Sequence, residues 1–280
     1  MTPSLPNDVR APAGPEHQGE APQLWVVTGH SRGLGEALAR LWLARGDHVL
    51  GISRGHWADA GPGETQWADS PGGLSQWQQD LASPLEAAER LREALAAQHR
   101  RPWRQVTLVN NAAIMNRLGP LEAESLDRLS AGIRAGVEAP ALLSAAWLSG
   151  TAGWGMPRRI LNISSGLGRR AMAGSAAYCA VKAGMDHLTR AMALDEAHKA
   201  SLGQAAATIV SLAPGVIDTD MQGQIRGSQS SGFPDLQRFV DLQAQQQLAT
   251  AQQTAERIDR FLSHSGFGNE AIVDIRTVQT

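Results

Sequence analysis

Two hydrophobic patterns alternate along most of the chain. Short unbroken apolar runs, typical of strands buried on both faces, occupy five segments: 24–29, 48–53, 106–110, 159–164 and 207–212. Apolar residues recur every three or four positions in four segments between or after them, which predicts helices: 34–45, 84–99, 125–148 and 175–198. This alternation predicts parallel strands joined by right-handed crossovers. The fold expected is a doubly wound α/β sheet with helices on both faces.

The two ends of the chain and one internal stretch depart from this pattern. Residues 1–22 contain five prolines and few apolar residues, so we expect a disordered tail before a single domain at 23–280. Residues 55–73 are rich in Gly, Pro and Trp and indicate a loop. The last 55 residues predict one or two Gln-rich helices and a short final strand at 271–275 (AIVDI).

Composition and charge exclude several classes of protein. The 280 residues are 42% hydrophobic and carry a net charge of −2 without a basic block, which argues against a nucleic-acid partner. No apolar run approaches the ~20 residues of a membrane helix. One cysteine allows no internal disulfide and no Cys-x-x-Cys metal site. A cytoplasmic protein without a metal is therefore expected.

A glycine-rich turn follows the first predicted strand, and a helix begins directly after it. Glycines let the backbone turn tightly against a pyrophosphate, and the amino end of a helix offers free N–H groups and a positive dipole. A turn that serves packing alone is the alternative, but the order of strand, turn and helix favours a nucleotide. The residues expected to contact it are Thr28, Gly29, Ser31, Arg32, Gly33, Leu34 and Gly35.

The end of the second strand indicates which nucleotide binds. An NAD site usually has an acidic residue there, on the ribose hydroxyls. This chain has Ser53 and Arg54 instead. Arg54 and Arg32 are suited to hold a 2′-phosphate through charge-assisted hydrogen bonds, so we expect NADP(H). Two solvated surface arginines are the alternative.

The only tyrosine and one of the two lysines are four residues apart on a predicted helix. Tyr178 and Lys182 therefore share a helix face. We expect the ammonium to lower the pKa of the phenol, which makes the pair a proton donor for a carbonyl. Ser165, at the end of the preceding strand, is placed to hydrogen-bond the substrate oxygen. A solvated Tyr–Lys pair and a turn-capping serine are the alternatives.

These motifs together resemble the short-chain dehydrogenase/reductase superfamily over about residues 23–280. The resemblance rests on the glycine turn, Asn110-Asn111-Ala112-Ala113, Ser165, the Tyr178/Lys182 pair and the segment 214–219 (PGVIDT). It implies a Rossmann-like fold. The segments 159–190 and 214–226 and the ending resemble the sepiapterin reductase and benzil (diketone) reductase subgroup, whose members use NADPH to reduce vicinal dicarbonyl compounds.

The resemblance also implies roles for individual residues. Tyr178 would be the general acid, with Lys182 lowering its pKa and holding the nicotinamide ribose, and Ser165 would orient the carbonyl. Asp274 matches the position of a pterin-anchoring aspartate, although a polar strand-end residue is an equal alternative. Further cofactor contacts are expected at Asp80, Leu81, Asn110, Ala112, Pro214, Gly215, Val216, Thr219 and Met221. Relatives form dimers or tetramers, so a homodimer or homotetramer is expected.

The chain departs from the family pattern at one catalytic position. Relatives usually have an Asn in the long helix that completes a catalytic tetrad, and this chain has Gly136 there. The Asn is thought to hold a helix kink whose carbonyl binds a relay water. Glycine also permits a kink. We expect a weakened but present proton relay.

The sequence therefore predicts an NADPH-dependent carbonyl reductase of small aromatic or vicinal dicarbonyl substrates. Residues 216–246 are expected to form a substrate lid with an apolar wall at Phe233, Leu236 and Phe239. Cys179 is expected to be a packed thiol. Loop or surface positions, not metal sites, are expected for His30, His187 and His198. The alternatives are a 3-oxoacyl or steroid ketone reductase of the same superfamily and a non-catalytic NADP-binding sensor or scaffold.

Overall fold

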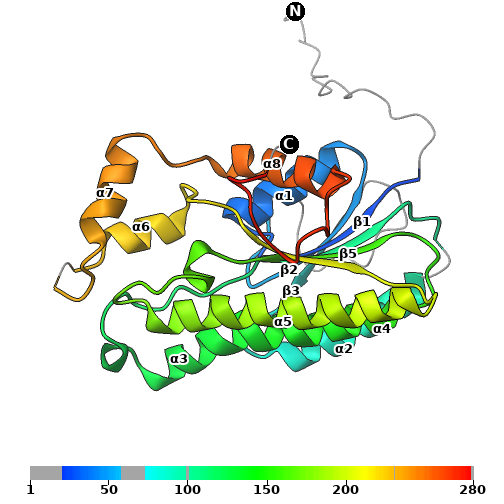
Figure 1. The fold of residues 1–280 in the computed structure, drawn as a ribbon, viewed down its shortest axis with the longest axis horizontal. Coiled ribbons are helices and arrows are strands. Elements are labelled where there is room, and N and C mark those ends of the chain that lie inside the picture. The colour runs from blue at the N-terminus through cyan, green and yellow to red at the C-terminus, as the bar shows by residue number, and fades with distance from the viewer. Residues whose placement is uncertain (1–20, 58–72, 99–100, 230, 279–280) are drawn as a thin grey trace, which may run out of the picture.

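A seven-stranded parallel sheet forms the centre of the molecule (Figure 1). The computed structural model describes residues 21–57, 73–98, 101–229 and 231–278. The strands are β1 (Leu24–Thr28), β2 (His48–Ser53), β3 (Leu74–Gln78), β4 (Val106–Asn110), β5 (Arg158–Ile163), β6 (Thr208–Ala213) and β7 (Ile272–Asp274). Their order is β3-β2-β1-β4-β5-β6-β7, with every neighbouring pair parallel. The predicted doubly wound sheet is confirmed.

Helices cover both faces of the sheet (Figure 1). One face carries α1 (Gly33–Ala44) and α8 (Ala251–Ser263). The other carries α2 (Pro84–Gln98), α4 (Ala139–Gly150) and α5 (Ala176–Ser201), with α3 (Leu126–Ile133) beside α5. Beyond one end of the sheet, at the left of Figure 1, lie α6 (Asp220–Arg226) and α7 (Leu236–Ala244). The short turns η2 (Leu121–Ala123) and η4 (Gly166–Gly168) follow β4 and β5.

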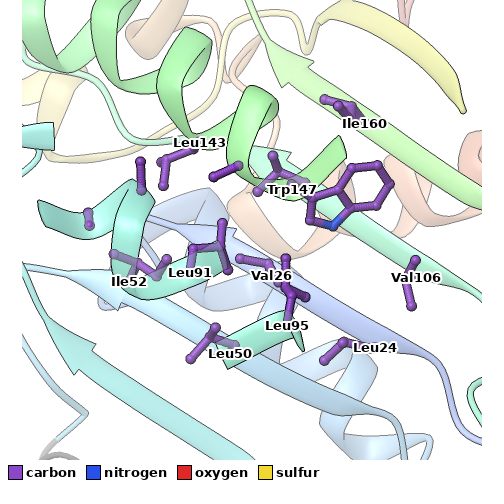
Figure 2. Packing of buried hydrophobic residues seen from close by; sticks show 14 of the residues in the cluster. Leu24, Val26, Leu50, Ile52, Leu91, Leu95, Val106, Leu143, Trp147 and Ile160 are labelled. Carbon is purple, nitrogen blue, oxygen red and sulfur yellow. The ribbon is translucent and has the colours of Figure 1, made fainter. Parts of the chain in front are cut away.

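The buried core has one half on each face of the sheet. Figure 2 shows the first half, in which strand side chains such as Val26 and Ile160 face Leu91 of α2 and Trp147 of α4. All of the residues of β1 are buried, as expected for a strand packed on both sides. On the opposite face Trp25 and Trp42 stack with ring centroids 3.8 Å apart. The sheet is thus a rigid base for the loops at its carboxyl ends.

The long helix predicted at 125–148 is interrupted in the structure. Ser125 caps α3 through the backbone N–H of Arg128, and α4 continues to Gly150. Between them, η3 (Arg134–Glu138) is one turn of π-helix, in which the N–H of Ala139 bonds to the carbonyl of Arg134. A π-turn inserts an extra residue and is a recognised cause of a helix kink.

The predicted tail and internal loop fall mostly outside the described residues. This applies to residues 1–20 of the tail and to residues 58–72 of the loop. At the other end, α7, α8 and β7 match the expected helices and final strand, although β7 spans only three residues. None of the described helices is long and apolar enough to cross a membrane.

Candidate active site

The glycine turn between β1 and α1 requires glycine at three positions. Gly29 and Gly33 have φ angles of +70° and +58°, a region in which side chains are strained. A Cβ on Gly35 would lie less than 3.0 Å from the carbonyl oxygen of Gly29. The backbone of α1 therefore approaches β1 as closely as a pyrophosphate-binding turn requires.

The segment after β4 holds this turn in place. The Thr28 hydroxyl accepts hydrogen bonds from the N–H groups of Asn111 and Ala112, both at 2.9 Å. The side-chain amide of Asn111 in turn donates to the carbonyls of Thr28 (2.9 Å) and Gly29 (3.3 Å). Asn111 belongs to the sequence motif after the fourth strand but was given no role there; its place directly after a buried strand was the available signal.

The amino end of α1 fits a nucleotide phosphate. Its N-cap residue, Arg32, makes no side-chain hydrogen bond to the helix, so the first-turn N–H groups have no side-chain cap and can face an anion. The exposed Arg32 lies 3.2 Å from the carboxylate of Asp220. A Cβ on Gly33 would lie 3.5 Å from Thr219. The structure thus brings the glycine turn beside the distant segment 214–221, as the cofactor assignment requires.

The end of β2 lies beside the same turn. Arg54 is exposed, and a Cβ on Gly55 would come within 3.3 Å of the Ser31 hydroxyl. The Ser53 hydroxyl is buried and bonds to the carbonyl of Gly55 (2.7 Å) and to Nδ1 of His30 (3.1 Å). A direct contact of Ser53 with the cofactor stays a prediction, because this hydroxyl already has two partners.

His30 lies in the turn after β1, as expected of a loop residue, but it is fully buried, so the expected surface position is wrong. Its Nε2 lies 2.8 Å from Oε1 of Gln76, and its carbonyl accepts from the indole of Trp57. A Cβ on Gly51 would overlap the His30 ring. An isolated glycine inside a strand often marks a close approach; Gly51 was therefore the overlooked signal. Burial lowers the pKa of His30. The other two histidines, His187 and His198, are exposed as expected.

Ser165, Tyr178 and Lys182 come together at the carboxyl end of β5. Tyr178 and Lys182 are buried on one face of α5, and the Tyr178 hydroxyl shares a hydrogen bond with the Ser165 side chain. Nζ of Lys182 lies 5.6 Å from the centre of the Tyr178 ring. It also donates to the carbonyl of Ile163 at 2.7 Å. Because both side chains are buried, the alternative of a solvated Tyr–Lys pair is wrong.

The expected direction of the Tyr178 pKa is wrong for this arrangement. Burial raises the pKa of Tyr178 to about 12, with the Ser165 hydrogen bond acting in the opposite direction. Burial also lowers the pKa of Lys182 to about 8, while the charge of Asp186 opposes this. Desolvation is the largest cause for both groups, because neither faces water. At neutral pH the phenol therefore keeps its proton and the lysine is mostly charged, the states that proton donation needs.

Asn110 belongs to a buried polar chain between the central strands and helices. Its amide nitrogen donates to Asn162 (2.8 Å) and Ser144 (3.2 Å), and Asn162 donates to Thr189 of α5. The side-chain oxygen of Asn110 is buried and has no hydrogen-bond partner among the described residues. Asn110 links β4 to β5 and leaves an acceptor at the end of the strands, while its cofactor contact stays a prediction.

Gly136 lies in the π-turn η3, packed against α5. A Cβ at this position would lie less than 3.0 Å from Cγ1 of Val181, the neighbour of Lys182. The helix is irregular at this glycine, because a π-turn interrupts it. A larger side chain at position 136 would require Val181 to shift.

Two predicted site residues have partners of their own. The carboxylate of Asp274 pairs with the Arg276 guanidinium at 2.6 and 2.8 Å, a pairing that lowers the pKa of Asp274. Arg276 packs 3.8 Å from the position of a Cβ on Gly215. Asp80 is exposed and caps the turn at Ala82, followed by the buried Leu81. An anchoring role for Asp274 and a cofactor role for Asp80 stay predictions.

An apolar cluster joins the predicted lid to the loops after β4 and β5. Phe233 is fully buried, contacts Phe239 with ring centroids 5.7 Å apart, and packs with residues from the loops after β4 and β5. The cluster consists of Leu118, Ile225 and Phe233, with Met115, Met172, Leu236 and Phe239 at its edge. Phe233, Leu236 and Phe239, the predicted apolar wall, therefore lie in one cluster. A small cavity beside it is lined by Met115, Leu118, Gly174 and Tyr178, among others.

Comparison with known proteins identifies the family. Residues 23–230 match the short chain dehydrogenase family model. The chain belongs to the short-chain dehydrogenase family. It is 30% identical over 250 residues to a benzil reductase ((S)-benzoin forming) of Bacillus cereus, covering 89% of this chain and 98% of the relative. A benzil reductase of Bacillus subtilis is also 30% identical, over 79% of this chain and 85% of the relative.

A solved structure agrees with this assignment. A short-chain dehydrogenase/reductase from Burkholderia vietnamiensis has a TM-score of 0.59 and 31% identity, covering 92% of this chain and all of the other. The chain is therefore an oxidoreductase of the benzil reductase-like subgroup that acts on CH–OH or C=O groups with NAD(P)(H). The sensor alternative lacks support from these relatives.

Proposed function

We propose that this protein is an NADPH-dependent carbonyl reductase of small aromatic or vicinal dicarbonyl compounds. The observation that carries the proposal is the meeting of Ser165, Tyr178 and Lys182 at the carboxyl end of β5. The apolar cluster around Phe233 supports an aromatic substrate, because buried apolar walls select such ligands.

The residues of this chain divide the work of the reduction. The bound nicotinamide supplies the hydride. The Tyr178 hydroxyl donates a proton to the carbonyl oxygen, and the Ser165 hydroxyl hydrogen-bonds the same oxygen where negative charge develops. The Lys182 ammonium, fixed by the carbonyl of Ile163, favours loss of that proton from the phenol.

The preference for NADPH rests on the end of β2. Ser53 and Arg54 occupy the position where an acidic residue would hold a ribose diol, and Arg32 is exposed in the neighbouring turn. Both side chains are exposed, and a 2′-phosphate would compete with Asp220 for Arg32. The assembly as a homodimer or homotetramer, the lid at 216–246 and a cytoplasmic location are also parts of the proposal that rest on the sequence.

The direct test is NADPH consumption with four carbonyl compounds: benzil, sepiapterin, a 3-oxoacyl thioester and a steroid ketone. The proposal expects turnover of the first two and a fall of about 10³-fold or more in Tyr178→Phe. Turnover of the thioester or the steroid alone would favour the alternative reductases. Tight NADPH binding without turnover of any compound would favour the sensor.

A further inference from the structure

A buried carboxylate lies one helical turn beyond the proposed catalytic pair. Tyr178, Lys182 and Asp186 follow one another at intervals of four residues on α5 and therefore share one face. All three are buried, and Asp186 is only 1% exposed. An aspartate this deep in a protein is costly unless its charge is compensated. The groups that compensate the charge of Asp186 therefore need to be identified.

Each oxygen of the Asp186 carboxylate has a partner from a different element. Oδ1 accepts a hydrogen bond from the Ser211 hydroxyl of β6 at 2.6 Å. Oδ2 lies 3.3 Å from Nε of Arg169, which follows the η4 turn that begins next to Ser165. A Cβ on Gly168 would lie 2.8 Å from both Oδ2 of Asp186 and the carbonyl of Lys182. The turn after Ser165 is therefore packed directly over this stretch of α5.

Arg169 extends the connection to the last strand. Its terminal nitrogen donates to the carbonyl of Val273 at 3.2 Å, next to Asp274. The guanidinium thus joins the turn after Ser165, the catalytic helix and β7. It also neutralises part of the Asp186 charge, so the net field at Lys182 depends on both groups.

We propose that Asp186 is a positioning residue that holds Lys182 in its charged form, and that Arg169 limits this effect. The effect of Asp186 on catalysis rests on the proposed function, in which Lys182 assists proton transfer from Tyr178. Asp186 gives Lys182 a counter-charge inside the protein, separate from any charge that a cofactor brings. In support, the charge of Asp186 opposes the fall that burial causes in the pKa of Lys182.

The other charged groups around this face of α5 do not supply a second buried negative charge beside Lys182. Asp274 and Arg276 of the last strand pair with each other, and Tyr178 stays neutral well above pH 7. Cys179 lies beside Tyr178 and is half-buried. On α3 and η3, which also pack against α5, four charged side chains are exposed to solvent: Asp127, Arg128, Arg134 and Glu138.

The composition of the chain makes the ionisation of Lys182 directly measurable. Only two lysines occur in the sequence, so protein labelled with ε-¹³C lysine gives two side-chain signals, and a Lys199→Arg variant assigns them. The Lys182 signal is then followed against pH in the wild type, Asp186→Asn and Arg169→Gln. Ser211→Ala is the matched control, since it removes a hydrogen bond from Asp186 without changing charge.

The proposal expects the two charge variants to move in opposite directions. Asp186→Asn lowers the pKa of Lys182 by about one unit, and Arg169→Gln raises it. Ser211→Ala changes it by a much smaller amount. If Asp186→Asn fails to fold, the upward shift in Arg169→Gln still tests the idea. Shifts in the same direction, or no shift in Arg169→Gln, would overturn it.

Activity measurements separate this inference from the proposed function. In a working reductase, the high-pH limb of kcat/KM moves down in Asp186→Asn and up in Arg169→Gln. A merely structural role would lower activity without moving the limb in opposite directions. Opposite shifts of the lysine signal in a protein that reduces no carbonyl would support the role of Asp186 and refute the proposed function.

Discussion

Replacing Gly136 with alanine tests how tightly the π-turn packs against the helix that carries Lys182. The added Cβ would lie less than 3.0 Å from Cγ1 of Val181, whereas ordinary contacts are 3.4–4 Å. Val181 cannot move far, because it precedes Lys182 on α5 and is buried. We therefore expect Gly136→Ala to be destabilising, although the same change usually stabilises a helix.

The expected magnitude follows from two opposing effects. Exchange of glycine for alanine in a helix interior contributes about 1 kcal/mol of stability. Overpacking of a buried site costs about 1–3 kcal/mol, and this close contact falls toward the upper part of that range. The net loss is then about 1–2 kcal/mol. Gly184→Ala on α5 is the matched control, since its Cβ would meet Val137 at an ordinary 3.4 Å. It should leave stability unchanged or raise it.

Urea unfolding of four proteins measures this effect: the wild type, Gly136→Ala, Val181→Ala and the double variant. Val181→Ala removes the clashing methyl and alone costs about 2 kcal/mol. In the double variant the new methyl occupies the vacated space, so a favourable coupling free energy of about 1–2 kcal/mol is expected. The reasoning is refuted if Gly136→Ala matches Gly184→Ala in stability and no coupling is found.

Three further predictions concern the cofactor site and pH. Gly35→Ala should unfold more easily and bind NADPH poorly, because its Cβ would overlap the carbonyl of Gly29; normal binding by fluorescence titration would be inconsistent with the close backbone approach. Arg54→Ala should raise KM for NADPH by about tenfold with little change for NADH; equal changes for both would rule out a 2′-phosphate contact. Reduction should slow as pH rises through about 8, where Lys182 loses its proton, because Tyr178 titrates only near 12; a rate that stays constant from pH 7 to 10 would exclude the lysine as the group that titrates.

The fold could be predicted from the sequence because unbroken apolar runs alternate with helical patterns. This alternation is compatible with few topologies other than a parallel sheet covered on both faces. LWVVT, with all five residues buried, is an example: only a strand covered on both faces explains it. That Tyr178 and Lys182 share one helix face was equally predictable, since these rare residue types occur four residues apart; their catalytic role stays a prediction. Both arguments use only residues that are near one another in the sequence.

The parts that could not be predicted depend on contacts between distant segments. Gly136 in the π-turn at 134–138 packs against Val181; the sequence allowed a kink at this glycine but did not indicate a π-turn or its contact with another helix. The burial of His30 depends on the space left by Gly51 of another strand. The pKa of Tyr178 was predicted in the wrong direction because proximity to an ammonium is visible in the sequence and desolvation is not.

The transfer of deuterium from [4-²H]NADPH to benzil, with each 4-position labelled in turn, tests the central claim most directly. The account predicts benzoin that carries deuterium on its carbinol carbon from one of the two labelled cofactors. This product should be lost in Tyr178→Phe, while NADPH still binds. Benzoin without deuterium from either cofactor, or undiminished formation of the labelled product by Tyr178→Phe, would contradict the account.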